Sequence, residues 1–289
     1  MLTIKNNTGL STPDKWTVIL KVSVAISLLG QAYAHFQGAT AYRAILYTQQ
    51  LSEWWVSLLG LTWQDYINNP VMDSRLDMVI MVTGGFLFIT AVISLFITRR
   101  SPRWLMLFPI VASLLLCLQA YSHYLDAGLQ AAQLFEYSLQ SLSPLLLAGI
   151  WLKIPSRGFI FMGLILIALT FAAHGLYALG YYPVPGHFVD MTMASLNLSD
   201  DLARTLLTVA GIADIMVALA LFINPVRPLA LGYCIVWGLF TTAARYTTYV
   251  IGGALFWLTL DQTLPLILVR VVHFGIPLVW YLLNKKGVG

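Results

Sequence analysis

The chain has 289 residues, of which 59% are hydrophobic and 10% are charged, and its mean hydropathy is +0.79. Soluble domains usually carry about 25% charged residues, so water is not the main solvent of this protein. The formal net charge is +4, but the basic residues are scattered and form no stripe that would follow nucleic-acid phosphates. The composition therefore indicates an integral membrane protein with a lipid bilayer as partner, and it excludes a nucleic-acid-binding protein.

Apolar runs bounded by charges, Gly and Pro recur along the chain, and each is long enough to cross about 30 Å of hydrocarbon as an α-helix. A helix pairs its backbone amides within the segment, and these runs lack the alternation of β-barrel strands. We therefore expect an all-α integral membrane fold with eight transmembrane helices. They are predicted at residues 16–38, 75–98, 103–125, 130–153, 158–180, 202–223, 227–250 and 263–284.

Basic residues gather on one side of the membrane if the chain crosses eight times. That side carries both termini, and the positive-inside rule places it in the cytoplasm. The opposite, acidic side holds the two longest connections, 39–74 and 181–201. We expect a multi-pass protein of the bacterial cytoplasmic (inner) membrane, with residues 1–14 as a cytoplasmic tail. The basic residues on the cytoplasmic side are Lys5, Lys15, Arg99, Arg100, Arg103, Lys153, Arg157, Arg227, Lys285 and Lys286.

The predicted helices also form an internal repeat of four crossings. His35 and His174, each preceded by alanine, lie near the outer ends of the first and fifth helices. Gly85 in the second helix corresponds to Gly211 in the sixth. Because four crossings return the chain to its starting side, the repeat is parallel, with units at 15–153 and 157–286.

The repeat extends to the last helix of each unit, and it helps to decide whether the first helix is retained or cleaved. Pro144 in the fourth helix corresponds to Pro277 in the eighth, and each has a lysine nine residues on. A cleavable signal peptide is an alternative interpretation of the first helix, because two lysines precede an apolar stretch that ends in Ala-Tyr-Ala. Cleavage would remove one copy of the repeated helix, so we favour the retained form.

The two outer loops differ in their sequences. Residues 51–59 form an amphipathic stretch with paired tryptophans, which suits the headgroup region of the outer surface. The matching second loop contains Pro183 and Pro185, which prevent a continuous helix there. Different loops on a repeated scaffold indicate one specialised site.

The chain resembles the DoxX-like group of bacterial membrane proteins, four-helix modules with an aromatic, glycine-containing segment at the outer end of the first helix. The matching segments are 34–38 (Ala-His-Phe-Gln-Gly), 173–177 (Ala-His-Gly-Leu-Tyr) and 208–214 in the sixth helix. The resemblance implies a tandem pair of modules and an association with quinone-linked oxidation or membrane redox complexes. No catalytic residue of that group maps onto this chain, so whether it is an enzyme stays open.

Ionisable residues inside a membrane are candidates for function, because a charge near the bilayer centre is costly. Here they gather toward the outer ends of the helices, and Arg270 and His273 share one helix face because they are three residues apart. Arginines of the second unit favour an anionic or carbonyl-bearing ligand. The predicted ligand-binding residues are Glu136, His174, Arg204, Arg245, Arg270 and His273.

Structural interpretations stand beside this functional one. Arg204 and Arg245 can equally extend to lipid headgroups, and Arg270 less readily because it lies deeper. Glu136 can be only the ion-pair partner of Arg270 or Arg245. Asp214, deeper in the sixth helix, is either paired and structural or part of a proton path.

The histidines raise the question of haem, because imidazole is a common axial ligand. A bis-histidine haem on His174 and His273 is the weaker interpretation, since no histidine cluster has metal-ligand spacing. We interpret His35 and His123 as solvated residues near the outer interface. The sequence thus predicts no metal site, and a quinone is favoured over haem as cofactor.

Three functions compete. The leading one is a redox-associated protein that binds a quinone-like or anionic amphipathic ligand, with Arg270 and His273 as donors to its head group and Glu136 or His174 exchanging protons. The second is a carrier of small molecules or lipids, against which the lack of clearly broken helices argues. The third is a noncatalytic accessory subunit of a larger membrane complex.

Overall fold

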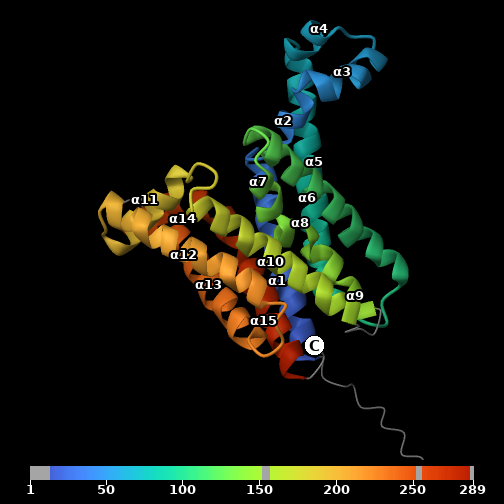
Figure 1. Ribbon diagram of the computed structural model, residues 1–289. Coiled ribbons are helices and arrows are strands. Elements are labelled where there is room, and N and C mark those ends of the chain that lie inside the picture. Colours follow the sequence, from blue (N-terminus) through green and yellow to red (C-terminus); the bar gives the residue numbers. More distant parts are fainter. Residues whose placement is uncertain (1–13, 152–156, 252–255, 287–289) are drawn as a thin grey trace, which may run out of the picture.

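The computed structural model describes residues 14–151, 157–251 and 256–286, and every regular element in these ranges is helical (Figure 1). The tail at 1–13, which contains Lys5, and Lys153 lie outside the described residues. Asp14, at the start of the first helix, accepts a hydrogen bond of 2.8 Å from Nζ of Lys286 at the end of the last. Both ends of the described chain therefore meet at one end of the bundle, which we call the terminal end; the opposite one is the distal end.

The helices pair in a repeated pattern. In the first half α1 packs along α5, and α6 packs against α8; in the second half α10 packs along α12, and α13 along α15. The first-half elements are α1 (Lys15–Phe36), α2 (Tyr42–Leu46), α3 (Gln49–Leu58), α4 (Trp63–Ile67), α5 (Pro70–Phe96), η1 (Arg103–Met106), α6 (Leu107–Asp126), α7 (Ala131–Glu136), α8 (Ser138–Leu146) and α9 (Ala148–Trp151). The second-half elements are α10 (Arg157–Ala178), α11 (Gly186–Leu196), α12 (Asp200–Ala220), α13 (Arg227–Ile251), α14 (Phe256–Leu268) and α15 (Val271–Lys285).

Six helices within the described residues are long and apolar enough to cross a membrane. Each coincides with one of the predicted spans, so the all-helical class is confirmed and the chain has the character of a membrane protein. The predicted spans at 130–153 and 227–250 are not among the six. The six are Lys15–Phe36, Pro70–Phe96, Arg103–Asp126, Arg157–Ala178, Asp200–Ala220 and Thr259–Lys285.

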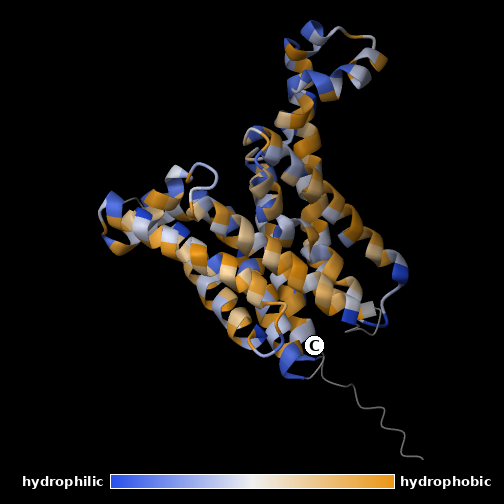
Figure 2. Ribbon diagram, viewed as in Figure 1, coloured by the Kyte–Doolittle hydropathy of each residue, from blue (hydrophilic) through white to orange (hydrophobic). Residues whose placement is uncertain are grey.

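Hydrophobic residues predominate along these helices, as the hydropathy colouring of Figure 2 shows. Large hydrophobic side chains stand exposed along α5 and α12, where a water-soluble protein would place polar ones. This surface fits contact with lipid tails. Examples are Val79, Val82, Phe88, Val209, Met216 and Leu219.

The two halves contact each other through their first and last segments. α1 packs against α14 and α15, and α10 packs against α7 and α8. Gly163 of α10 lies under the buried Trp280 of α15, because a Cβ at position 163 would collide with the indole ring. The indole Nε1 donates to the carbonyl of Ile160 at 2.8 Å. A glycine and one tryptophan thus fix the spacing of α10 and α15.

The segment predicted as the fourth helix is interrupted. α7 ends at Glu136 and α8 begins at Ser138. Just past the interruption, the amide of Leu139 donates to Oγ1 of Thr170 on α10, at 3.2 Å. A side chain of the other half therefore satisfies a backbone group at this point, as is common at breaks in helices.

The segment predicted as the eighth helix has a similar interruption. α14 ends at Leu268 and α15 begins at Val271. Oγ of Ser27 on α1 donates to the carbonyl of Val269 at 3.1 Å. Gly30 allows this approach, because a Cβ there would lie 2.7 Å from the Val269 amide nitrogen. The expectation that no helix is clearly broken is therefore wrong for both segments.

The first distal loop folds into α2, α3 and α4, a projection whose base, α2, packs against α6 and whose α3 and α4 stand out from the bundle at the tip of α5 (Figure 1). The predicted amphipathic stretch at 51–59 forms most of α3. The buried ring of Tyr66 holds this projection together, with Tyr47, Trp55 and Trp63 at ring-centroid distances of 5.8, 5.1 and 5.5 Å. Arg43 ties it to α5 through ion pairs of 2.9 Å with Asp73 and Asp77, whose side chains are about half exposed.

Candidate functional site

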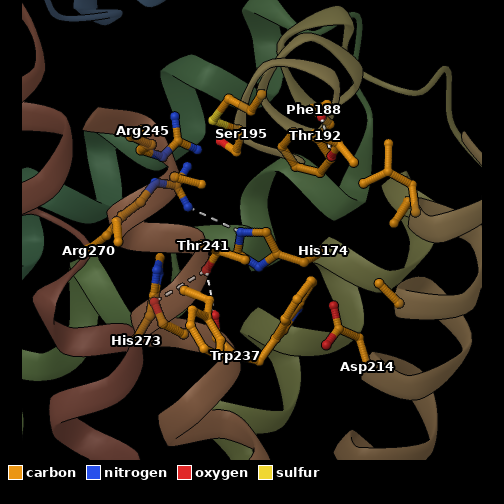
Figure 3. Close-up of a pocket in the computed structure, with 18 of the residues that line it drawn as sticks. His174, Phe188, Thr192, Ser195, Asp214, Trp237, Thr241, Arg245, Arg270 and His273 are labelled. Carbon is orange, nitrogen blue, oxygen red and sulfur yellow. Dashed lines mark hydrogen bonds between the residues drawn. The ribbon is translucent and has the colours of Figure 1, made fainter. Parts of the chain in front are cut away.

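A cavity of about 450 Å³ lies in the second half, enclosed by α10, α11, α12, α13 and the interruption between α14 and α15 (Figure 3). Its wall is mostly apolar, with residues such as Phe171, Met191, Leu207 and Ala210. In the close-up, Arg245, Arg270 and His273 lie on one side of the cavity and Asp214 on the other, with His174 between them. The cavity thus combines an apolar volume with a small set of charged and titratable groups.

Glu136, His174 and Arg270 form a contact group at the edge of this cavity. Nη2 of Arg270 donates to Oε1 of Glu136 at 3.2 Å, and Nη1 of Arg270 lies 3.2 Å from Nε2 of His174. His174 Nε2 is also 3.2 Å from Glu136 Oε1. The carboxylate and guanidinium side chains are only 9% and 12% exposed. Glu136 ends α7 and Arg270 precedes α15, so this group joins the two interruptions.

The position of the ring proton of His174 follows from its partners. Nδ1 lies 2.8 Å from the carbonyl of Thr170, which can only accept, so Nδ1 carries a hydrogen. Nε2 then accepts from Arg270 when the ring is neutral, and it donates to Glu136 when the ring is charged. Nε2 thus lies between a donor and an acceptor at the edge of the cavity.

His273 and Arg245 complete the basic side of the cavity. The ring of His273 is buried, lies 5.5 Å from that of His174, and has no hydrogen-bond partner for Nε2 within the described parts of the chain. Arg245 projects from α13 into the same wall. A buried imidazole nitrogen without a partner is costly, so a ligand oxygen at this position would be stabilised.

Arg204 is the one predicted site residue that the structure places elsewhere. It lies on α12, is 55% exposed, and donates from Nε to Oδ2 of Asp200 at 2.7 Å, one helical turn away. It lines neither of the two cavities described here. The prediction grouped Arg204 with Arg245 and Arg270 by depth along the helices, but its side chain points away from the cavity.

Asp214 lies in the cavity wall opposite Arg270. Its side chain is buried, and Oδ1 accepts a hydrogen bond of 2.9 Å from the hydroxyl of Tyr233. The sequence allowed two interpretations of Asp214, a paired structural residue or part of a proton path. The hydrogen bond from Tyr233 fits the paired interpretation. The proton path stays open, because the carboxyl group also lines the cavity.

A second cavity of about 320 Å³ lies on the other side of the basic residues. Phe188, Arg245 and Arg270 line both cavities and so form the partition between them. The walls of the second cavity are more polar than those of the first. Its lining includes Gln130, Gln133, Glu136, Tyr137, Tyr177 and His187.

His35, at the position in the first half that matches His174, has a different environment. It is fully buried, with Nδ1 at 2.6 Å from the carbonyl of Gln31 and Nε2 at 3.2 Å from the hydroxyl of Tyr42. The interpretation of His35 as a solvated interface residue is therefore wrong, because α2 folds over it. His123 is partly buried and stacks on Tyr137 at 4.5 Å.

Several cavity residues were missed from sequence. The sequence does contain a signal for Thr170, because this residue lies four positions before His174 and so on the same helix face. Phe188, Thr192 and Ser195 come from α11, which follows a proline-containing loop without a readable pattern. Their place in the wall depends on how that loop folds back over the bundle.

Within the described residues, no group of three or more His, Cys, Asp or Glu side chains is arranged to hold a metal ion. The fold and site together define an all-helical protein of membrane character with a mixed apolar and basic cavity. Comparisons of the chain with family models, curated proteins and solved structures give no match.

Proposed function

We propose that this chain is a multi-pass membrane protein that binds a quinone-like or anionic amphipathic ligand in the 450 Å³ cavity. The observation that carries the proposal is an apolar volume that meets Arg270, His174 and His273 on one side. Small-molecule sites are typically apolar pockets of about 300–1,000 Å³ with a few convergent polar groups. The ligand would place its head group against the basic side and its apolar part against α11, α12 and α13.

The head group has two kinds of partner in this arrangement. Arg270 offers a charged donor to a carbonyl or an anion, and Nε2 of His273 offers a nitrogen that the described residues leave without a partner. His174 lies between Arg270 and Glu136 and can exchange a proton with a ligand oxygen. These roles are binding and proton exchange, and they leave open whether the protein is an enzyme.

We further propose that the bundle has eight transmembrane passes arranged as two parallel repeats. The α1–α5 and α10–α12 pairs occupy equivalent places, as do α6–α8 and α13–α15. His35 and His174 each hydrogen-bond through Nδ1 to the carbonyl four residues earlier. Both fourth segments are interrupted. These features support the tandem arrangement expected from the DoxX-like resemblance.

The membrane and orientation follow from the charge distribution. Arg99, Arg100 and Arg103 lie in the turn between α5 and α6, which is at the terminal end of the bundle in Figure 1. We propose that this end faces the cytoplasm of a bacterial cell, which puts the cavity in the outer half of the cytoplasmic membrane. An association with membrane redox metabolism rests on the DoxX-like resemblance.

The test is purification from the native membrane in mild detergent, with an absorption spectrum and mass spectrometry of the organic extract. We expect a quinone or an anionic amphiphile in the wild type and in Arg204→Gln, whose arginine is exposed on α12. Arg270→Gln should retain at least tenfold less of this molecule than the wild type, since a hydrogen bond to a charged group contributes about 1.5–3 kcal/mol. The proposal fails if no such molecule copurifies and no quinone analogue binds the purified wild type.

A carrier is a second candidate, and the interruptions in both fourth segments favour it. In transporters made of repeats, discontinuous helices from the two halves meet at the substrate site. Here Glu136 and Arg270 come from such interruptions and bind each other. Uptake into proteoliposomes that Arg270→Ala abolishes would identify a carrier, whereas binding without uptake would exclude it.

A noncatalytic accessory subunit is the third candidate. The projection made of α2, α3 and α4 carries the exposed side chains of Trp54 and Leu58 away from the bundle. Such residues are common in protein interfaces. Copurification of a stoichiometric partner from the native membrane would support this role, and a monodisperse single chain would argue against it.

A further inference from the structure

The 450 Å³ cavity is lined by side chains of both α12 and α13. α12 packs mainly on α10, and α13 packs mainly on α15 and α11, so these two neighbours share little direct contact. Leu206 of α12 and Phe240 of α13 both line the cavity, and they are 37% and 62% exposed. Ala243 of α13 also lines the cavity and is exposed. This combination points to an opening between α12 and α13 that the three residues frame, which we call the side portal.

The surface around the side portal is apolar. Val209 and Ile212 of α12 and Val236 and Leu239 of α13 are large exposed hydrophobic residues near it. α12 is also one of the helices that are long and apolar enough to cross a membrane. A hole framed by such a surface opens onto lipid tails, whereas the polar second cavity lies beyond Arg245 and Arg270.

We infer that the ligand reaches the cavity sideways from the bilayer and keeps a linear hydrocarbon chain in the side portal. This inference rests on the proposed function, and it narrows the ligand class to amphiphiles with a compact carbonyl or carboxylate head on one long chain. The head lies at Arg270 and His174, and the chain passes between Leu206 and Phe240 toward the lipid. Small water-soluble anions lack the part that the portal and the apolar wall would bind.

Trp237 provides a local reporter, because its ring lines the cavity. The full-length protein in lipid nanodiscs would be titrated with two pairs of probes: a benzoquinone with a decyl chain against the same ring with a methyl group, and a brominated stearate against bromoacetate. Both the quinone ring and bromine quench tryptophan fluorescence, and Trp237→Phe identifies the part of the signal that comes from the cavity.

We expect the wild type to bind the long-chain member of at least one pair tenfold or more tightly than its short partner. Which pair responds distinguishes a quinone from a fatty-acid-like ligand. Leu206→Phe, which places a bulkier ring in the portal and adds no tryptophan to the signal, should raise the Kd of the long-chain probe to that of the short one. Leu219→Phe is the matched control, because Leu219 is 67% exposed on α12 and does not line the cavity.

Ala243→Phe narrows the same portal from α13 and replaces Leu206→Phe if that variant does not fold. Equal binding of long and short probes by the wild type would overturn the side portal while the proposed ligand site stands. Unchanged Kd values of the long-chain probe in both portal variants would also overturn the side portal and leave the ligand site standing. If no probe quenches Trp237 in the wild type, the proposed function itself fails.

Discussion

Glu136 and Arg270 are each poorly placed in a membrane when alone, and each contacts the other at the junction of the two halves. Their side chains are 9% and 12% exposed, and His174 lies within 3.2 Å of both. A buried charge that loses its partner is strongly destabilising, whereas an exposed pair contributes little. The same chain offers both kinds of pair, since Arg204 and Asp200 are 55% and 52% exposed.

Glu136→Gln should therefore lower the free energy of unfolding by about 3 kcal/mol, because it leaves Arg270 without its carboxylate. Asp200→Asn should cost no more than about 0.5 kcal/mol. Denaturation by SDS from mixed micelles measures both. The double variant Glu136→Gln, Arg270→Gln should lose less than the sum of its single variants. Equal costs for Glu136→Gln and Asp200→Asn would contradict this account.

At the scale of elements, small residues decide how closely helices approach. Gly84 of α5 faces α1, where a Cβ would lie 2.9 Å from Cβ of His35. The adjacent Gly85 faces open space, with nothing within 4 Å. Gly211 of α12 makes the equivalent approach to α10, 2.9 Å from the carbonyl oxygen of Gly175. Gly84, and not the adjacent Gly85, thus makes the close helix contact in the first half that Gly211 makes in the second.

Substitutions at these neighbouring glycines should have opposite effects on stability. Gly84→Ala should cost about 2 kcal/mol, because α1 and α5 must separate to admit the methyl group. Gly85→Ala should stabilise by about 0.5–1 kcal/mol, since alanine is the better helix former and meets no neighbour. Thermal unfolding of both variants in one detergent tests the pair. Equal stability of the Gly84→Ala and Gly85→Ala variants would mean that α1 and α5 are not closely packed.

At the scale of the whole molecule, the terminal end is closed by a contact between the first and last helices. The hydrogen bond from Lys286 lowers the pKa of Asp14 below its usual range. A carboxylate with a lowered pKa stabilises the fold above its unfolded pKa of about 3.9, and this contribution is lost as the pH falls through the folded value. Both side chains are about half exposed, so the effect is small.

Asp14→Asn should thus cost no more than about 0.5 kcal/mol at pH 7. The difference from wild type should vanish as the pH falls through the lowered pKa of Asp14. Unfolding measured across this pH range checks both statements. Lys286→Gln serves as control. It removes the same hydrogen bond, so it should reduce the pH dependence of the free energy of unfolding by the same amount as Asp14→Asn. A difference that grows at low pH would contradict the ion pair.

The proposed orientation of the whole bundle can be tested by labelling. In a background with Cys117 and Cys234 changed to serine, Ser57→Cys places a thiol on α3 at the distal end, and Arg100→Cys places one in the α5–α6 turn. A membrane-impermeant maleimide should label Ser57→Cys in intact cells. It should label Arg100→Cys only after lysis. The reverse pattern would invert the orientation.

Sequence was sufficient for properties that depend on local composition. Hydropathy predicted six helices that the structure contains, because apolar length is read directly from neighbouring residues. It also selected Glu136, His174, Arg245, Arg270 and His273, because a charge within an apolar run is conspicuous. The same reasoning included Arg204, since depth along a helix says nothing about the direction in which a side chain points.

Tertiary structure decided the rest. The contact between Glu136 and Arg270 joins residues 134 positions apart in the chain, and only the packing of the two halves brings them together. The interruptions at 137 and 269–270 are stabilised by hydroxyl groups of Thr170 and Ser27 on other helices. The cavity exists because α11 folds over α12 and α13. Such features depend on pairs of surfaces, whereas a sequence pattern describes one helix at a time.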